Sequence, residues 1–433
     1  MNRVSEEQLK EAINGFQFEG NLISIKPYGS GHINDTYLLT YEIGKMGSIR
    51  VILQRVNQEI FTNPVELMQN IEGVTTYLKK IIKKNGGDPE RETLNLIPAK
   101  DEKYYFVDSK GEYWRSYKYI TDATSYDLVE NPKDFYESAV AFGHFQKLLS
   151  NYPAETLNET IKGFHDTESR LIAFKEAVEK DSFGRAAKVQ KEIRFVLERE
   201  EISSVFGKLL AKGEIPLRVT HNDTKLNNIM IDYATGKGLC VIDLDTIMPG
   251  LAMNDFGDSI RFGASTAAED EKDLEKVTCS MELFELYTKG FLEECREQLT
   301  TKEIELLPMG AKVMTFECGI RFLTDYLEGD HYFKIHREGH NLDRCRTQFK
   351  LVKDMEEKLS RMKEIVNKYK RYCERNEQKR ANCLQYFMEL LQFQIRQPDL
   401  CSSQPVLRQI TYCAKVAFAK LNAPSGDTYT PDR

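Results

Sequence analysis

A run of polar residues in the middle of the chain has the types and spacing that phosphoryl transfer requires. It contains His221, Asp223 and Asn228, and a further acidic residue, Asp243, closes the short apolar run that follows. In enzymes that transfer a phosphoryl group from a nucleoside triphosphate, one Asp accepts the proton of the attacking hydroxyl. Asn and a second Asp hold the Mg2+ that bridges the phosphates. The pattern predicts a small-molecule kinase that uses ATP and Mg2+.

Each acidic residue of this run has an expected role. Asp223 is the expected catalytic base, because it falls in a loop between a helical stretch and a strand, where a carboxylate can face a cleft. Asn228 and Asp243 are the expected metal ligands, with Asp245 as a third on the same side of the same strand. The apolar residues around them predict a buried strand, in which a carboxylate needs a partner. An Asp that only caps a turn is the alternative for Asp243 and Asp245.

Residues near the motif are expected to support it rather than to react. We expect His221 to orient the loop through hydrogen bonds. Residues 255–257 read Asp-Phe-Gly, the metal-binding tripeptide of protein kinases, but Asp243 already ends the appropriate strand. Asp255 and Asp258 are therefore predicted to fix the catalytic loop, with Arg261 as an ion-pair partner.

A glycine turn near the N-terminus is the expected phosphate-binding loop. Gly29, Ser30 and Gly31 are small enough to let backbone N–H groups approach phosphates closely. His32 and Asn34, directly after them, are expected to face the phosphates or the acceptor. A plain hairpin turn is the alternative, because a third glycine is missing.

The next two strands and a helix supply the candidate phosphate anchor. Arg55 is the expected cation for the α- and β-phosphates, since arginine grips phosphate through two N–H groups. Glu72, in the helix that follows, is its expected ion-pair partner. A solvated Glu on the helix face is the alternative.

The elements that must position these residues fall into two groups. Alternating apolar residues predict strands in the first part of the chain, with one amphipathic helix among them. The predicted strands are 22–26, 36–41, 50–56, 104–107 and 113–120, and the helix is 65–84. Helical periodicity then dominates, over 134–149, 168–179, 186–210, 274–299, 303–327 and 342–372, interrupted by strands at 228–232 and 239–242.

This order predicts an α+β chain with a bilobal, protein-kinase-like fold. Residues 1–121 are the expected β-rich, nucleotide-binding lobe, and residues 122–375 the mainly helical lobe for catalysis and acceptor binding. The tail, 376–433, has no functional interpretation, and both a docked helix and a loose appendage stay open.

Composition limits the partners. The net charge of −7 argues against a nucleic-acid partner but not against ATP, because Arg, Lys and Mg2+ can reverse the field locally. The nine Cys form no Cys-x-x-Cys pair, which is typical of reduced thiols and predicts a cytoplasmic location. The longest apolar runs are too short for a transmembrane helix, so no membrane partner is expected.

Several stretches resemble the bacterial N-acetylhexosamine 1-kinases, within the aminoglycoside phosphotransferase/choline kinase superfamily. The stretches are 29–37, 52–57, 218–228, 241–261 and 321–332. The resemblance, which covers residues 15–365, implies ATP- and Mg2+-dependent phosphorylation of the anomeric hydroxyl of N-acetylglucosamine or N-acetylgalactosamine. It implies Asp223 as the base, Asn228 and Asp243 as metal ligands, and Arg321 and Tyr332 as sugar contacts. Arg55 departs from the protein-kinase pattern, in which Lys is usual.

Two other functions stay open. The first is another kinase of the superfamily, acting on choline, homoserine or an aminoglycoside; Arg321 beside the acceptor would oppose a cation. The second is an inactive nucleotide-binding scaffold. The joint presence of a base and two metal ligands argues against the scaffold.

Overall fold

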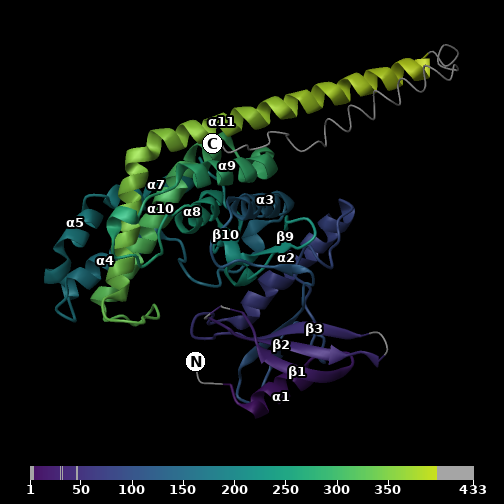
Figure 1. Cartoon of the computed structure of the whole chain (residues 1–433), viewed down its shortest axis with the longest axis horizontal. Helices are drawn as coiled ribbons and strands as arrows, with labels where there is room; N and C mark the ends of the chain where they lie inside the picture. Colours follow the sequence, from purple (N-terminus) through teal and green to yellow (C-terminus); the bar gives the residue numbers. More distant parts are fainter. Residues whose placement is uncertain (1–3, 30, 32, 45–46, 397–433) are drawn as a thin grey trace. The chain divides into compact units, whose positions relative to one another are not determined.

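The computed structural model describes residues 4–29, 31, 33–44 and 47–396 (Figure 1). The strands are β1 (Asn21–Pro27), β2 (Asp35–Glu42), β3 (Ser48–Arg55), β4 (Phe106–Val107), β5 (Tyr113–Lys118), β6 (Ala123–Thr124), β7 (Arg218–Thr220), β8 (Ile229–Asp232), β9 (Gly238–Val241) and β10 (Met248–Gly250). The helices are α1 (Glu6–Gly15), α2 (Pro64–Lys84), α3 (Pro132–Leu148), α4 (Thr167–Lys180), α5 (Gln190–Leu197), α6 (Glu200–Ser203), α7 (Val205–Ala211), α8 (Ala252–Gly263), α9 (Met281–Cys295), α10 (Thr301–Leu327) and α11 (His340–Arg396).

The chain divides into two compact units, Met1–Asn367 and Lys368–Arg433. Every described candidate residue lies in the first unit. The predicted boundaries at 121 and 375 stay predictions.

An antiparallel sheet in the order β1-β2-β3-β5-β4 forms the N-terminal part of the first unit. Strand β3 alternates along its length, so that Val51 and Leu53 lie buried on one face. With Trp114 of β5, they pack against Ala12 and Phe16, at the end of α1. Trp114 is fully buried, and its indole N–H donates to Asp108 (3.0 Å).

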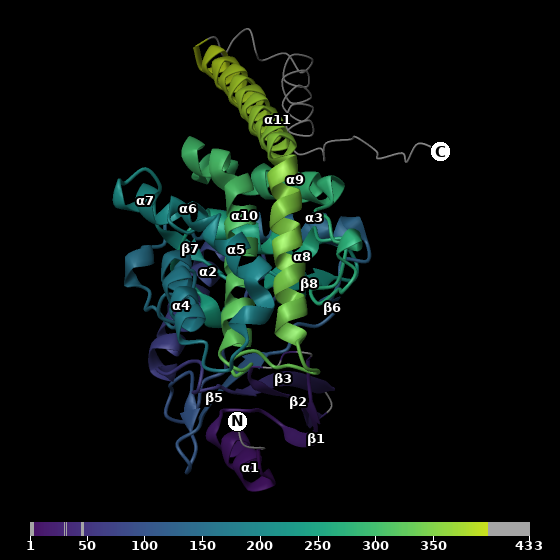
Figure 2. The same cartoon turned by 90° about the vertical axis from the view of Figure 1, so that its left-hand side faces the viewer.

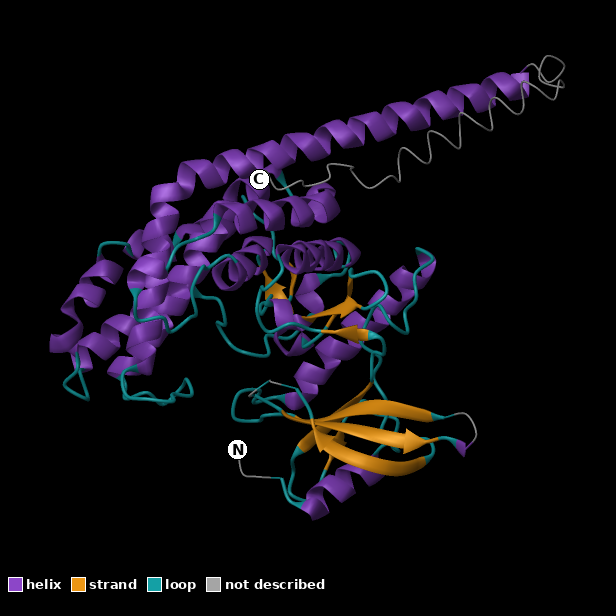
Figure 3. Cartoon of the chain, viewed as in Figure 1, coloured by secondary structure: helices purple, strands orange, loops and turns teal. Residues whose placement is uncertain are grey.

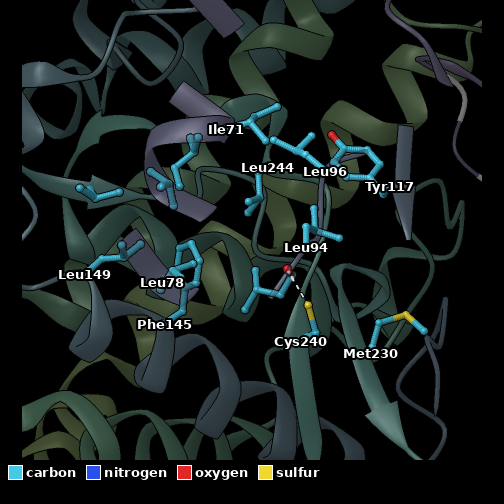
Figure 4. Close-up of a cluster of buried hydrophobic side chains, with 14 of the residues drawn as sticks. Ile71, Leu78, Leu94, Leu96, Tyr117, Phe145, Leu149, Met230, Cys240 and Leu244 are labelled. Carbon is cyan, nitrogen blue, oxygen red and sulfur yellow. Dashed lines mark hydrogen bonds between the residues drawn. The ribbon is translucent and has the colours of Figure 1, made fainter. Parts of the chain in front are cut away.

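The opposite face of this sheet is joined to the helical part by one apolar cluster (Figure 4). It takes Ile71 and Leu78 from α2, Tyr117 from β5, Phe145 from α3 and Met230 from β8. Helix α2 lies over the sheet because its apolar residues recur at helical spacing. Burial of each large side chain contributes about 1.5–3 kcal/mol to stability. The sheet and the helical part therefore share a core.

Helices make up most of the rest of the unit, while the long strands gather at its other end (Figures 2 and 3). Helix α3 packs on α9, and α8 packs on α10. The α8–α10 contact is close because Gly257 faces Gly310. A Cβ added to Gly257 would lie 2.3 Å from the Gly310 carbonyl oxygen. Short strands lie beside these helices in two small sheets, β6-β8-β9 and β10-β7.

The predicted α+β fold, with a β-rich N-terminal part and a helical remainder, is confirmed. Two element predictions were wrong. The expected helix 186–210 is broken into α5, α6 and α7. At one break the hydroxyls of Ser203 and Ser204 donate to the carbonyls of Glu200 and Glu201 instead of extending the helix.

The second error concerns the strand that was expected to carry both acidic residues. Strand β9 ends at Val241, and residues 244–246 form a 3-10 turn. Asp243 and Asp245 therefore share a turn rather than one face of a strand. Among the described helices, none is long and apolar enough to cross a membrane.

Candidate active site

The loop after β7 brings together the three residues expected to carry the chemistry. The Asn228 side-chain amide donates to the backbone oxygen of Asp223 (2.8 Å) and to its carboxylate (3.1 Å). The backbone N–H of Ile242 donates to the Asn228 carbonyl (2.9 Å), as β8 pairs with β9. Asp243 follows directly, so it lies at the same end of this strand pair as Asn228.

Two side chains at this point carry oxygen atoms that accept no hydrogen bond from the described residues. Within the described parts of the chain, no group donates to the Asn228 amide oxygen or to the Asp243 carboxylate. Asp243 has a positive φ of 58° and an exposed side chain. Surrounding protein and the negative charges of Asp245 and Asp223 raise the pKa of Asp243 to about 7. A cation is the partner that would satisfy both oxygens.

Asp223 is held in its ionised form. Desolvation opposes its charge, but the ammonium of Lys225, 2.7 Å from its carboxylate, and the hydrogen bond from Asn228 hold the pKa of Asp223 below its usual value. About a third of the Asp223 side chain stays exposed (29%). An ionised, accessible carboxylate can accept a hydrogen bond from a bound hydroxyl at neutral pH.

Helix α8 fixes the backbone of this loop with two buried carboxylates. Asp255 accepts hydrogen bonds from the amides of His221 (2.9 Å) and Asn222 (2.8 Å). Asp258 accepts from the amide of Thr224 (3.1 Å) and pairs with Arg261 (2.9 Å). These are the contacts expected of loop-fixing residues.

His221 also orients the loop, as expected. Its ring Nε2 donates to the carbonyl of Ile242 (2.9 Å), and its Nδ1 accepts from the amide of Asp223 (3.3 Å). The imidazole thus ties the catalytic loop to the end of β9. Because both ring nitrogens are engaged by the backbone, the imidazole serves to orient the loop.

The side chain of Asp245 contacts residues of the N-terminal part of the chain, so its surroundings differ from those of Asp243. It forms a buried ion pair with Arg115 of β5, and it accepts from the Asn34 side chain (2.7 Å). Asn34 in turn accepts from the backbone of Asn57 (3.0 Å). Asp245 is therefore a weaker candidate for a metal ligand than Asp243, and Asn34 links the glycine turn to the acidic turn.

The expected Arg55–Glu72 pair is wrong. In the region described, the carboxylates recorded beside the Arg55 guanidinium are those of Asp35 (2.6 Å) and Glu112 (3.9 Å), both from its own sheet. Strand β2 pairs with β3 so that Asp35 lies opposite Arg55, and Glu72 lies exposed on α2. Phosphate binding by Arg55 stays a prediction.

The glycine turn is described only in part. Gly29 has a positive φ of 83°, which glycine adopts without strain, and a Cβ added to it or to Gly31 would meet open space. Ser30 and His32 lie outside the described residues.

The predicted acceptor contacts lie on α10 and the loop after it. The Arg321 guanidinium donates to the Tyr332 hydroxyl (3.3 Å) and lies 5.4–5.7 Å from the ring centres of Phe164, Tyr332 and Phe333. The Phe164 ring lies 4.5 Å from that of His165, tilted by 46°, and His165 bonds to the carbonyl of Asn222. Arg321 is thus connected to the catalytic loop through two aromatic side chains.

Comparison with known proteins decides the family. The model of a phosphotransferase enzyme family matches residues 24–277, more than half of the chain. The chain belongs to this phosphotransferase family.

One solved structure agrees with the fold of this phosphotransferase, and two others are reported beside it. An aminoglycoside phosphotransferase from Alicyclobacillus acidocaldarius is similar with a TM-score of 0.53 and 9% identity, covering 85% of this chain and 97% of its own. A microcompartment-associated aminopropanol kinase has a TM-score of 0.49 and 17% identity, covering 82% and 98%. A choline kinase from Cryptosporidium parvum has a TM-score of 0.48 and 15% identity, covering 80% and 93%.

The phosphotransferase contains a place that fits Mg2+. The Asn228 amide oxygen and the Asp243 carboxylate are hard oxygen donors, which Mg2+ prefers, and a metal held by two protein ligands leaves positions for phosphate oxygens. Groups of three or more His, Cys, Asp or Glu side chains with metal-binding geometry are not found among the described residues.

Three ionisable residues of the phosphotransferase were not predicted from the sequence. They are Arg115, which neutralises Asp245; Lys225, which pairs with Asp223; and His165, behind the catalytic loop. Lys225 was within reach of prediction, because it lies two residues after Asp223. Arg115 and His165 meet the site only through tertiary structure, and nothing in their local sequence marks them.

Proposed function

We propose that the protein is an ATP- and Mg2+-dependent kinase that phosphorylates the anomeric hydroxyl of an N-acetylhexosamine. The observation that supports phosphoryl transfer best is the grouping of Asp223 with two uncommitted oxygen donors, from Asn228 and Asp243, in a chain of a phosphotransferase family. The residue types match the base and metal ligands that such a reaction uses.

The reaction follows from these positions. The acceptor hydroxyl donates a hydrogen bond to the Asp223 carboxylate and gives it a proton as the new O–P bond forms. The bond between the γ-phosphorus and the oxygen bridging to ADP breaks. Mg2+ held by Asn228 and Asp243 would neutralise charge on the phosphates. Lys225, paired with Asp223, keeps the base ionised before the acceptor binds.

The charges near Arg321 support a neutral acceptor over a cationic one. Desolvation and then the positive charge of Arg321 lower the pKa of Arg170 on α4. Two guanidinium groups therefore make this region positively charged. Choline and aminoglycosides carry positive charge and would be repelled there. The N–H groups of Arg321 suit the oxygens of a sugar.

The direct test is an assay of purified protein with ATP, Mg2+ and a panel of acceptors. The panel contains N-acetylglucosamine, N-acetylgalactosamine, choline, homoserine and an aminoglycoside. We expect acceptor-dependent ADP release with an N-acetylhexosamine and a product that carries phosphate on the anomeric oxygen. Turnover of choline alone would refute the sugar assignment, and no turnover of any acceptor would refute the kinase. Asp223→Asn serves as the inactive control.

A further inference from the structure

His165 lies between the catalytic loop and α10, and the mechanism above does not use it. Its ring Nε2 lies 3.0 Å from the Asn222 carbonyl oxygen, and its Nδ1 lies 2.9 Å from a carboxylate oxygen of Glu317. The imidazole side chain is one-tenth exposed, and that of Glu317 is buried. The ring therefore spans from one helix to the residue just before Asp223.

Both ring nitrogens face oxygen acceptors, which limits the protonation state. A carbonyl only accepts, so Nε2 must carry a proton and donate it to Asn222. Toward Glu317, either Nδ1 donates to an ionised carboxylate, or a neutral carboxylic acid donates to Nδ1. The Thr167 hydroxyl donates to the other carboxylate oxygen of Glu317 (2.5 Å), which favours the ionised acid.

The charges around the ring favour the same state. Desolvation opposes protonation, but the charge and hydrogen bond of Glu317, together with Asp258 on α8, raise the pKa of His165 above its ordinary value. Desolvation also acts on Glu317, yet His165 and Arg321 hold the pKa of Glu317 below its ordinary value. Glu317 also attracts Arg170 of α4, a second cation on the same carboxylate.

The bond from His165 falls where the loop needs support. Asn222 has a positive φ of 65°, a left-handed conformation that few side chains other than Asn and Asp adopt. The backbone amide of Asn222 donates to Asp255, and its side-chain amide donates to the Thr246 carbonyl (2.8 Å). The Asn222 carbonyl accepts from His165. The peptide that leads into Asp223 is thus fixed on both sides.

We infer that His165 is a doubly protonated positioning residue, which holds the Asn222 peptide against Glu317 and so sets the reach of Asp223 toward the acceptor. The inference rests on the proposed role of Asp223. It implies that the loop is best ordered while the imidazole is a cation. Turnover should therefore fall as pH rises through the pKa of His165.

The first test observes the ring itself and needs no acceptor. Nitrogen NMR of the full chain labelled in histidine, with His165→Gln to assign its signals, distinguishes an imidazolium, with two similar nitrogens, from a neutral ring with two different ones. At pH 7 we expect the imidazolium pattern for His165. A neutral ring, hydrogen-bonded to a protonated Glu317, would overturn the inference whatever the acceptor proves to be.

The second test measures turnover against pH in three variants. His165→Gln keeps a donor but has no charge, so kcat should be about tenfold to a hundredfold lower than in the wild type at low pH. The kcat of this variant should no longer decrease as the pH rises. Its KM for ATP should stay unchanged. Glu317→Gln should move the fall to lower pH. His144→Gln is the matched control, because His144 also pairs with a Glu (Glu294, 3.1 Å) but lies half exposed on α3.

The outcomes separate this inference from the proposed function. If kcat of His165→Gln decreases at high pH as it does in the wild type, the positioning role is overturned, even if the protein phosphorylates a hexosamine. A different acceptor in the panel would refute the sugar assignment and leave the pH test intact with that acceptor. An equal effect of His144→Gln would show a general loss of stability and would also overturn the inference.

Discussion

At the scale of residues, the site depends on carboxylates that differ in what surrounds them. Asp223 has a cation at 2.7 Å, Asp245 has a buried one, and Asp243 has neither within the described residues. The pKa of Asp223 is lowered, while desolvation and neighbouring carboxylates raise the pKa of Asp243 to about 7. The same chemical group thus has three different surroundings, which suit the proposed proton acceptor, a structural anion and the proposed metal ligand.

Replacing Asp223 tests the base. Asp223→Asn keeps the size of the side chain but cannot accept a proton, so kcat should fall by a factor of about 10^2 to 10^4. ATP affinity, measured by calorimetry, should stay near that of the wild type. A variant with a wild-type kcat would remove the assignment.

Replacing Asp243 tests the metal site. In Asp243→Asn the anionic ligand is lost while Asp223 and Asn228 remain, so nucleotide affinity should drop when Mg2+ is present. Titration of ATP with and without Mg2+ measures the difference. If Mg2+ strengthens nucleotide binding equally in the variant and the wild type, Asp243 is not a ligand.

At the scale of elements, the site is assembled from the ends of short strands and a 3-10 turn, held from two sides. Helix α8 holds the catalytic loop through Asp255 and Asp258, and β5 holds the acidic turn through Arg115. The loop itself has few apolar side chains with which to hold its shape. Its geometry therefore depends on how closely these elements pack.

The buried ion pair of Arg115 and Asp245 joins the N-terminal sheet to the turn that contains Asp243 and Asp245. Arg115→Met should lower the free energy of unfolding by about 3–5 kcal/mol, because it leaves a buried carboxylate uncompensated. Urea denaturation measures the loss. The double variant with Asp245→Asn should recover part of it, and a single variant as stable as the wild type would contradict this account.

The glycine contact between α8 and α10 is a second test of packing. Gly257→Ala places a methyl group against backbone that cannot move aside, so stability should fall by about 1–3 kcal/mol and kcat should fall as α8 shifts. Gly207→Ala on α7 is the control. Its Cβ would lie 3.5 Å from Glu168, an ordinary contact, and the change should stabilise the protein by about 0.4–1 kcal/mol. Thermal unfolding of both variants checks the contrast.

The sequence predicted the elements with a clear period and missed those without one. Strand β3 and helix α2 were predictable because their buried residues alternate or recur at helical spacing. Helix α8 was missed because nearly all of its residues are buried, polar ones included, so no polar face marks it.

The site was predictable to the same extent. The proximity of Asp223, Asn228 and Asp243 could be predicted because their spacing is local, while their roles stay predictions. The partner of Arg55 was wrong because Asp35 faces it across a strand pair, a relation that spacing does not reveal. The bond from Asn34 to Asp245 joins positions far apart in the chain and needed the fold.

At the scale of the whole molecule, the described candidate residues and the two apolar clusters lie within Met1–Asn367. Removal of Lys368–Arg433 should therefore leave phosphoryl transfer and the thermal unfolding temperature near those of the full chain. Removal of 397–433 alone is the milder control. A folded but inactive shorter protein would assign a catalytic role to the second unit.

Trp114 gives the molecule an optical label that needs no engineering. It is the one tryptophan of the 433-residue sequence, and it lies buried in β5 next to Arg115. Its emission therefore reports on the N-terminal sheet alone, whereas far-ultraviolet circular dichroism is dominated by the helices. If both signals disappear at one urea concentration, the shared core makes the two halves melt together; if they separate, the sheet and the helices come apart in turn.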